Sequence, residues 1–187
     1  MTINILDACV LYPPSLRDLL MWLASVRLYA PRLTEEIHTE WIRNVLADNS
    51  EVTPAQLDRT RRLMNQVSSN CVVSDYEMYT STVRLPDEND RHVLAAAIKS
   101  KASSIVTYNL SDFPVETLQE FGIQPIHPDA FLSGLFDEKK QLFLRGVRSH
   151  RESLHNPPKD VAGYIQTLKV NRLHELAARL TGHEDEI

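Results

Sequence analysis

The chain has 187 residues, with 20 lysines and arginines against 25 aspartates and glutamates, so its formal net charge is −5. A hydrophobic fraction of 43% and a charged fraction of 24% exclude a disordered or fibrous chain. No apolar run approaches the roughly 18–20 residues that cross a bilayer. The N-terminal apolar stretch is interrupted by Asp7 and lacks a basic region, so it is not a signal peptide. Cys9 and Cys71 are expected to be reduced thiols of a cytoplasmic protein.

Short β-rich runs alternate with helical segments along the first two thirds of the chain. These runs predict buried strands at residues 2–6, 71–73, 104–107 and 123–126. Strands that are separated by helices form a parallel sheet covered on both faces. The sequence therefore predicts a three-layer α/β/α fold of the Rossmann-like class.

Polar residues mark the starts and ends of the predicted helices. Ser15, Thr34 and Thr53 are each placed to cap a helix N-terminus, and Pro54 suits a first helical position. The acidic turn that begins at Pro86 leads into a helix ending near residue 102. A short helix over residues 115–121 is expected to stop at Gly122 in a left-handed C-cap.

Only helical patterns follow Asp129. We expect helices near 129–135 and 137–154, a break at Pro157-Pro158, two shorter helices, and a frayed tail over residues 182–187. The predicted organisation is therefore an α/β domain over 1–128 and a C-terminal helical extension over 129–187.

Acidic residues collect where the parallel strands end. Asp7 follows the first strand, Asp112 follows the strand at 104–107, and Asp87 and Asp90 open the central helix, with Glu40 on an earlier helix. Binding sites of open α/β sheets lie beyond the carboxyl ends of their strands. Converging carboxylates repel one another, so a divalent cation would neutralise them, and oxygen ligands favour Mg²⁺ or Mn²⁺.

Each acid taken alone also has a local explanation. Asp87 and Asp90 could cap the central helix, Glu40 could pair with Arg43, and Asp112 could form a turn. Asp7 is harder to explain in this way, because a carboxylate directly after a buried strand is costly unless it is paired or metal-bound.

Four segments resemble, in order, the acidic motifs of PIN-domain proteins, and most closely the VapC-type ribonuclease toxins of toxin–antitoxin operons. They are ILDACVLYP at 5–13, LTEEIHTEW at 33–41, DENDRHVLAAAI at 87–98 and IVTYNLSDF at 105–113. The resemblance implies a PIN nuclease domain over 1–128 that cleaves RNA with Mg²⁺ or Mn²⁺. It also implies a cognate antitoxin as partner and a homodimer, for which Trp22, Tyr29 and Trp41 are candidate contacts or core residues.

Carried onto this chain, the resemblance implies Asp7, Glu40, Asp90 and Asp112 as catalytic acids, with Asp7, Asp90 and Asp112 as metal ligands. Many relatives carry the fourth acid where this chain has Asn109. Either Asp112 takes over that role, with Asn109 as a ligand, or the site uses only three acids. Further supporting or substitute residues are Asp87, Thr107 and Asn109.

Other functions remain open at this point. A haloacid-dehalogenase phosphatase is excluded, since it needs a second acid at position 9, where this chain has cysteine. A DNA-cleaving nuclease, a catalytically degenerate PIN module that binds RNA or protein, and a purely structural role of the acids are the alternatives.

The net charge conceals an uneven distribution. Residues 139–172 carry eight basic residues against Glu152 and Asp160, an excess of six positive charges over 34 residues. This segment is either a solvated helical face or a phosphate-binding surface. Within it, Arg145, Arg148 and Arg151 are predicted to contact RNA.

Overall fold

A four-stranded, all-parallel sheet forms the centre of the computed structural model, which describes residues 1–155 and 157–187. The strand order is β2-β1-β3-β4, so β1 and β3 are the two inner strands. Ile5 of β1 lies opposite Arg32 of β2 on one side and Ile105 of β3 on the other. The strands are β1 Ile3–Leu6, β2 Ala30–Arg32, β3 Ser104–Val106 and β4 Gln124–Ile126.

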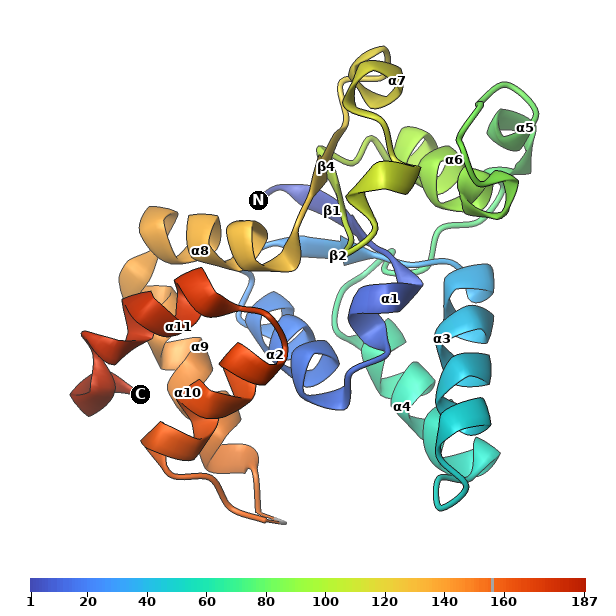
Figure 1. Cartoon of the computed structure of the whole chain (residues 1–187). Coiled ribbons are helices and arrows are strands. Elements are labelled where there is room, and N and C mark those ends of the chain that lie inside the picture. The colour runs from blue at the N-terminus through green and yellow to red at the C-terminus, as the bar shows by residue number, and fades with distance from the viewer. Residues whose placement is uncertain (156) are drawn as a thin grey trace.

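Helices cover both faces of this sheet (Figure 1). Helix α6 packs on β1 and β3. Helix α2 packs on β2 and also contacts α9. The α/β/α fold predicted from the sequence is therefore confirmed. The helices are α1 Ala8–Leu11, α2 Pro14–Ser25, α3 Glu35–Asp48, α4 Pro54–Gln66, α5 Glu77–Thr80, α6 Arg91–Ser100, α7 Val115–Gln119, α8 Pro128–Glu138, α9 Lys140–Ser153, α10 Val161–Val170 and α11 His174–Thr181. Short 3₁₀ turns occupy Glu88–Asp90, Leu110–Asp112 and Glu184–Glu186.

Two of the predicted caps are present and one is not. Thr34 accepts a hydrogen bond from Ile37 N (3.0 Å), and Thr53 forms a reciprocal capping box with Gln56. Ser15 lies inside α2, whose N-cap is Pro13, because proline at the first helical position needs no hydrogen-bond acceptor. The Ser15 hydroxyl instead accepts a hydrogen bond from the side chain of Asn171.

The strand prediction was wrong at two places. Residues 71–73 form a single bridge, between Leu33 and Val72, rather than a strand. Strand β2 was not predicted, since it is short and contains Pro31. Ala30 N donates to Thr2 O beside β1, so an N–H at the next residue, position 31, would point away from β1. Proline, which has no N–H, is therefore tolerated at that position.

A buried carboxylate joins two of the C-terminal helices to each other. Asp129, at the start of α8, is 7% exposed and accepts hydrogen bonds from Glu175 N and Leu176 N (2.9 Å each), which caps α11. The tail is not frayed as predicted, because Ile187 is buried. No helix in the described residues is long and apolar enough to span a membrane.

A buried histidine lies in the middle of these helices. His150 is 2% exposed, and its Nδ1 lies 2.8 Å from the Tyr164 hydroxyl. Burial, with a smaller contribution from the charge of Lys159, lowers the pKa of His150 to about 4. The folded protein therefore holds this imidazole neutral under conditions that protonate it in the unfolded chain.

This histidine predicts a loss of stability in acid. Its folded pKa lies below the unfolded value of about 6.5, so stability is complete above that pH and falls as the pH drops toward 4, by at most about 1.4 kcal/mol per pH unit. We expect His150→Asn to flatten the pH dependence of the unfolding free energy in urea titrations. The exposed His174→Asn is the matched control, and an unchanged slope in His150→Asn would contradict the assignment.

Candidate active site

Asp7 ends β1 and caps the short helix α1. Its backbone N donates to Val106 O (3.1 Å), which extends the pairing of β1 with β3 by one residue. The carboxylate is 4% exposed and accepts hydrogen bonds from Ala8 N (2.7 Å) and the Thr107 hydroxyl (2.7 Å). These donors keep a buried carboxylate in one orientation at the carboxyl edge of the sheet.

Cys9 is a third partner of this carboxylate and was not predicted as a site residue. Its thiol donates to Asp7 Oδ2 (3.1 Å) and accepts from Tyr108 N (3.2 Å). Burial and the neighbouring Asp7 charge raise the thiol pKa far above its usual range, so Cys9 is a protonated donor and not a nucleophile. The only sequence signal was its position two residues after Asp7.

The other predicted acids line a single cleft beside Asp7. The cleft has a volume of about 560 Å³ and lies between α3, the turn that precedes α6, and the loop after β3. It brings together residues from three distant segments of the chain, namely Glu40, Asp87, Asp90, Asn109 and Asp112. Asp7 does not line the cleft, but its charge acts on Glu40 and Asp90.

Burial and mutual repulsion both act on the acids of this cleft. Burial, followed by the charges of Asp7, Asp87, Asp112 and Glu40, raises the pKa of Asp90 to about 7. Burial and Asp7 also raise the pKa of Glu40, and nearby Arg43 opposes that shift. Among the described residues, none of these five acids forms an ion pair.

The local explanations of these acids are therefore incomplete. Asp87 does accept a hydrogen bond from Asn89 N (2.9 Å), as a cap would. Asp90 precedes α6 but its side chain makes no cap hydrogen bond. Glu40 and Arg43 line the same cleft without the predicted ion pair between them.

Thr107 and Asn109 occupy different positions in the site. Thr107 is fully buried, donates to Asp7, and accepts from Asn109 N (2.9 Å), so it fixes the loop after β3. Asn109 and Asp112 both line the cleft. Of these two, only Asp112 brings negative charge to Asp90.

Two further residues at the cleft were missed by the sequence reasoning. His92 Nδ1 lies 3.3 Å from Glu36 Oε2, and burial lowers the His92 pKa. Arg43 follows Glu40 by one helical turn and also lines the cleft. Arg43 could have been found because it lies three residues after Glu40 on the same helix. His92 could have been found because it directly follows Asp90 and Arg91.

Two protein-family models match parts of this chain. The model of the PIN domain family matches residues 2–111. The chain belongs to the PIN-domain family. A second model, described as the VapC50 C-terminal domain, matches residues 128–182.

One curated relative shares sequence with part of this PIN-domain protein. It is the "Putative ribonuclease VapC50" of Mycobacterium tuberculosis (strain ATCC 25618 / H37Rv), 50% identical over 61 residues. The match covers 31% of this chain and only 36% of that protein. No solved structure matches the chain significantly.

The donor set of this PIN domain fits a hard divalent cation. Carboxylate and amide oxygens are the ligands that Mg²⁺ and Mn²⁺ prefer, and the unpaired charge that raises the pKa of Asp90 is what a cation would neutralise. In the part of the chain that the structure describes, no three His, Cys, Asp or Glu side chains lie close enough together to hold a metal ion. The acids thus surround an open cleft.

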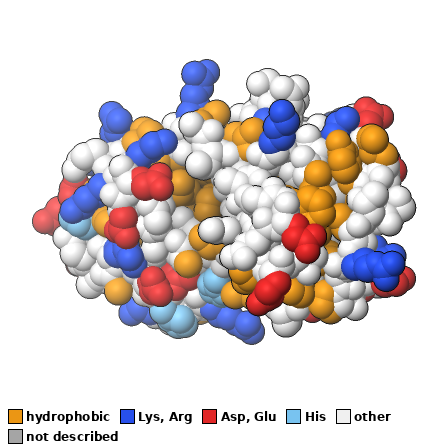
Figure 2. Space-filling view, turned by 90° about the horizontal axis from the view of Figure 1, so that it is seen from above, with side chains coloured by type: hydrophobic (Ala, Val, Ile, Leu, Met, Phe, Trp, Pro, Cys, Tyr) orange, Lys and Arg blue, Asp and Glu red, His pale blue; other side chains and the backbone are white. Residues whose placement is uncertain are grey.

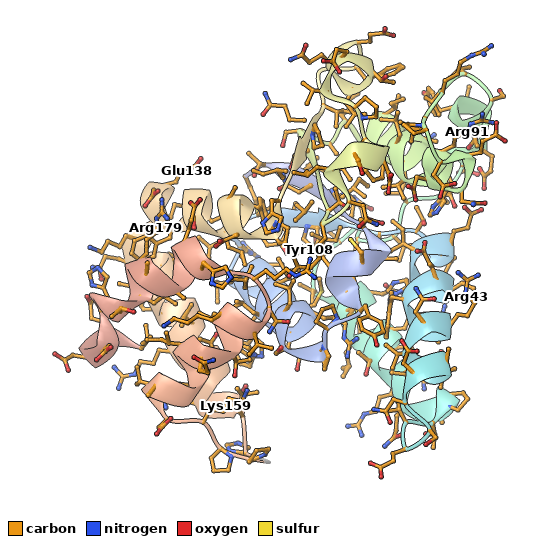
Figure 3. All side chains as sticks on the ribbon, viewed as in Figure 1. Arg43, Arg91, Tyr108, Glu138, Lys159 and Arg179 are labelled. Carbon is orange, nitrogen blue, oxygen red and sulfur yellow. The ribbon has the colours of Figure 1, made fainter. Side chains whose placement is uncertain are left out.

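The three arginines predicted to contact RNA do not line this cleft. Arg145, Arg148 and Arg151 lie on α9, which packs on α2 and α8. Arg148 pairs with Glu152 (3.0 Å), and Arg151 donates to Lys159 O. Figure 3 shows Lys159, which follows this helix, far from Arg43 on α3. Acidic and basic side chains are interspersed over the face drawn in Figure 2.

Two of the three aromatic candidates for a dimer contact are core residues. Trp41 and Tyr29 are at most 1% exposed, so they cannot contribute to an interface without unfolding. The guanidinium of Arg17 lies 4.5 Å from the centre of the Trp41 ring, which shows how completely that side chain is enclosed. Only Trp22 retains partial exposure.

The repulsion among the acids predicts that this cleft destabilises the metal-free fold. The folded pKa of Asp90 exceeds the unfolded value, so stability is lost as the pH rises from about 4 through 7. We expect Asp90→Asn to stabilise the metal-free protein at pH 8 by about 1 kcal/mol after solvent screening. Thermal unfolding at pH 5 and pH 8 measures this, with the exposed Asp75→Asn as control. Equal effects at both pH values would contradict it.

Proposed function

We propose that this PIN-domain protein is a Mg²⁺- or Mn²⁺-dependent endoribonuclease and acts as the toxin of a toxin–antitoxin pair. The observation that carries the proposal is the meeting of Glu40, Asp90 and Asp112 in one cleft over buried Asp7, without ion pairs among the described residues. Membership of the PIN family and the partial similarity to a protein named as a ribonuclease support RNA as the substrate.

Within this proposal, Asp7, Asp90 and Asp112 would hold the cation. When bound, the cation would lower the pKa of a water molecule and offset the charge that develops on the phosphodiester. Asp7 is oriented for this role by Thr107 and Cys9. Asp87 and Asn109 stand at the cleft as supporting or substitute ligands.

Glu40 is the proposed general base. Burial and the neighbouring acids raise its pKa, which strengthens the carboxylate as a proton acceptor. Glu40 would take one proton from the attacking water as the oxygen–phosphorus bond forms. The bond to the 3′ oxygen breaks in line, and that oxygen leaves with a proton from solvent, giving a 3′ hydroxyl and a 5′ phosphate.

The proposed partners follow from the same family membership. A cognate antitoxin would cover the acidic cleft and place a basic side chain among the carboxylates. A homodimer and the two-part organisation, a nuclease domain over 1–128 with a helical extension over 129–187, are also proposed. The separate family matches at 2–111 and 128–182 support this division.

The central test is cleavage of matched RNA and DNA oligonucleotides with and without EDTA. We expect Mg²⁺-dependent cleavage of RNA, and a loss of about a hundredfold or more in Asp7→Asn and Asp90→Asn, since each removes charge at the reacting phosphate. Asp75→Asn, outside the cleft, should keep full activity.

Other outcomes of this test separate the alternatives. Preferential cleavage of DNA would establish the DNA-acting nuclease. Absence of cleavage, together with absence of carboxylate-dependent Mg²⁺ binding heat in calorimetry, would establish a degenerate binding module. Full activity in both Asp→Asn variants would overturn the assigned site.

The arginines of α9 give a separate prediction. Reversing the charges of Arg145, Arg148 and Arg151 to glutamate should weaken RNA binding and reduce the slope of its salt dependence, if this helix contacts phosphates. Binding titrations at several salt concentrations measure both quantities. If neither changes, the helix is a solvated face.

A further inference from the structure

A second groove is lined by Cys9, whose thiol donates to Asp7. It has a volume of about 240 Å³ and is formed by Cys9, Tyr12 and Pro13 on one side and by Val170, Asn171 and Arg172 on the other, with Tyr108 between them. The groove thus joins the end of α1 to the turn between α10 and α11. Figure 3 shows Tyr108 between the C-terminal helices and α1.

The groove and the cleft share a dividing segment. Cys9 lines the groove and donates its thiol proton to Asp7. Tyr108 lines the groove, and the next residue, Asn109, lines the acidic cleft. An RNA strand bound across the cleft would therefore place one of its neighbouring nucleotides at the groove.

Aromatic and cationic side chains give this groove the chemistry of a single-strand subsite. Tyr12 is 37% exposed, and its hydroxyl donates to Asp48 Oδ2 (2.9 Å), which leaves the ring available for stacking. Val170 is 73% exposed and adds an apolar edge. Bases stack on such side chains whatever their sequence, while arginine contacts the phosphates.

Arg172 supplies the positive charge. Its guanidinium lies 5.9 Å from the centre of the Tyr108 ring, and it forms no ion pair with any described residue. Arg172 is the last residue of the basic segment 139–172. It lines this groove, whereas the α9 arginines do not.

The turn that carries Arg172 is fixed to the sheet domain. Arg172 has a φ of +58°, and Leu173 after it is fully buried. Tyr108 donates its hydroxyl proton to Asn171 O (2.6 Å), and the Asn171 side chain donates to Ser15 (2.9 Å). These contacts give the groove a defined shape before any ligand arrives.

We propose that this groove is a subsite for one nucleotide of single-stranded RNA adjoining the cleavage site, with the base on Tyr12 and the phosphate on Arg172. It rests on the proposed function for its ligand. Arg172 would also place a positive charge next to the cluster of carboxylates that the negatively charged RNA must approach.

The test measures binding of a labelled single-stranded RNA oligonucleotide by fluorescence anisotropy, using the full chain with Glu40→Gln to suppress cleavage. Arg172→Asn removes the charge while keeping a residue that tolerates positive φ. We expect about fivefold to tenfold weaker binding and a salt slope reduced by about one. Arg172→Lys should restore most of the affinity.

Tyr12 has a matched pair of variants. Tyr12→Leu should weaken binding by about fivefold or more through loss of stacking. Tyr12→Phe keeps the ring and loses only the hydrogen bond to Asp48, so it should bind like the parent. Arg27→Asn is the control for Arg172, because Arg27 is also an exposed arginine with positive φ at a helix end.

The outcomes distinguish this proposal from the proposed function. If the wild type cleaves RNA but Arg172→Asn and Tyr12→Leu bind it like the parent, the subsite is overturned and the nuclease stands. If those variants weaken binding while the wild type cleaves nothing, the subsite stands and the nuclease proposal fails. If the parent binds no RNA, or Arg27→Asn weakens binding equally, the subsite is overturned.

Discussion

A buried carboxylate is the constraint on which the rest of this structure depends. Asp7 lies where β1 ends, and burying its charge is tolerable only with donors on several sides. Ala8 N, the Thr107 hydroxyl and the Cys9 thiol provide them, so the ends of β1 and β3 are joined through one side chain. None of these donors is a cation, and the negative charge of Asp7 therefore still acts on Glu40 and Asp90 across the cleft.

The net charge of the chain describes this molecule poorly. Part of the negative charge is gathered in a cleft whose acids form no ion pairs among the described residues, and burial together with this charge raises the pKa of Asp90. Arg43 brings positive charge to the cleft and Arg172 brings it to the groove beside Cys9, and the two belong to segments far apart in the chain. The distribution of charge over the molecule, and not the net charge, determines where an anionic substrate can bind.

The alternation of strands and helices predicted the sheet class, and the strand ends drew attention to Asp7 and Asp112. The role proposed for Glu40, which lies on a helix, came from the resemblance to PIN-domain motifs. Residues whose position depends on packing between distant segments were not predictable in this way. Cys9 was read only as a core thiol, and Trp41 was left as a possible interface residue although it lies on the buried face of α3. Strand β2 was missed because Pro31 is a poor strand residue whose missing N–H costs nothing at that position.

The C-terminal helices are part of the site's construction and not an appendage to it. The segment after β3 that separates the cleft from the groove carries Thr107, which holds Asp7, and Tyr108, which is bonded to Asn171. Asp129 caps α11 from the start of α8, so the turn at Asn171 cannot shift without disturbing that cap. The Tyr108–Asn171 hydrogen bond thus ties these helices to the residue that directly precedes Asn109 in the loop after β3. The extension contacts the loop that bears Asn109 and Asp112 without itself lining the acidic cleft.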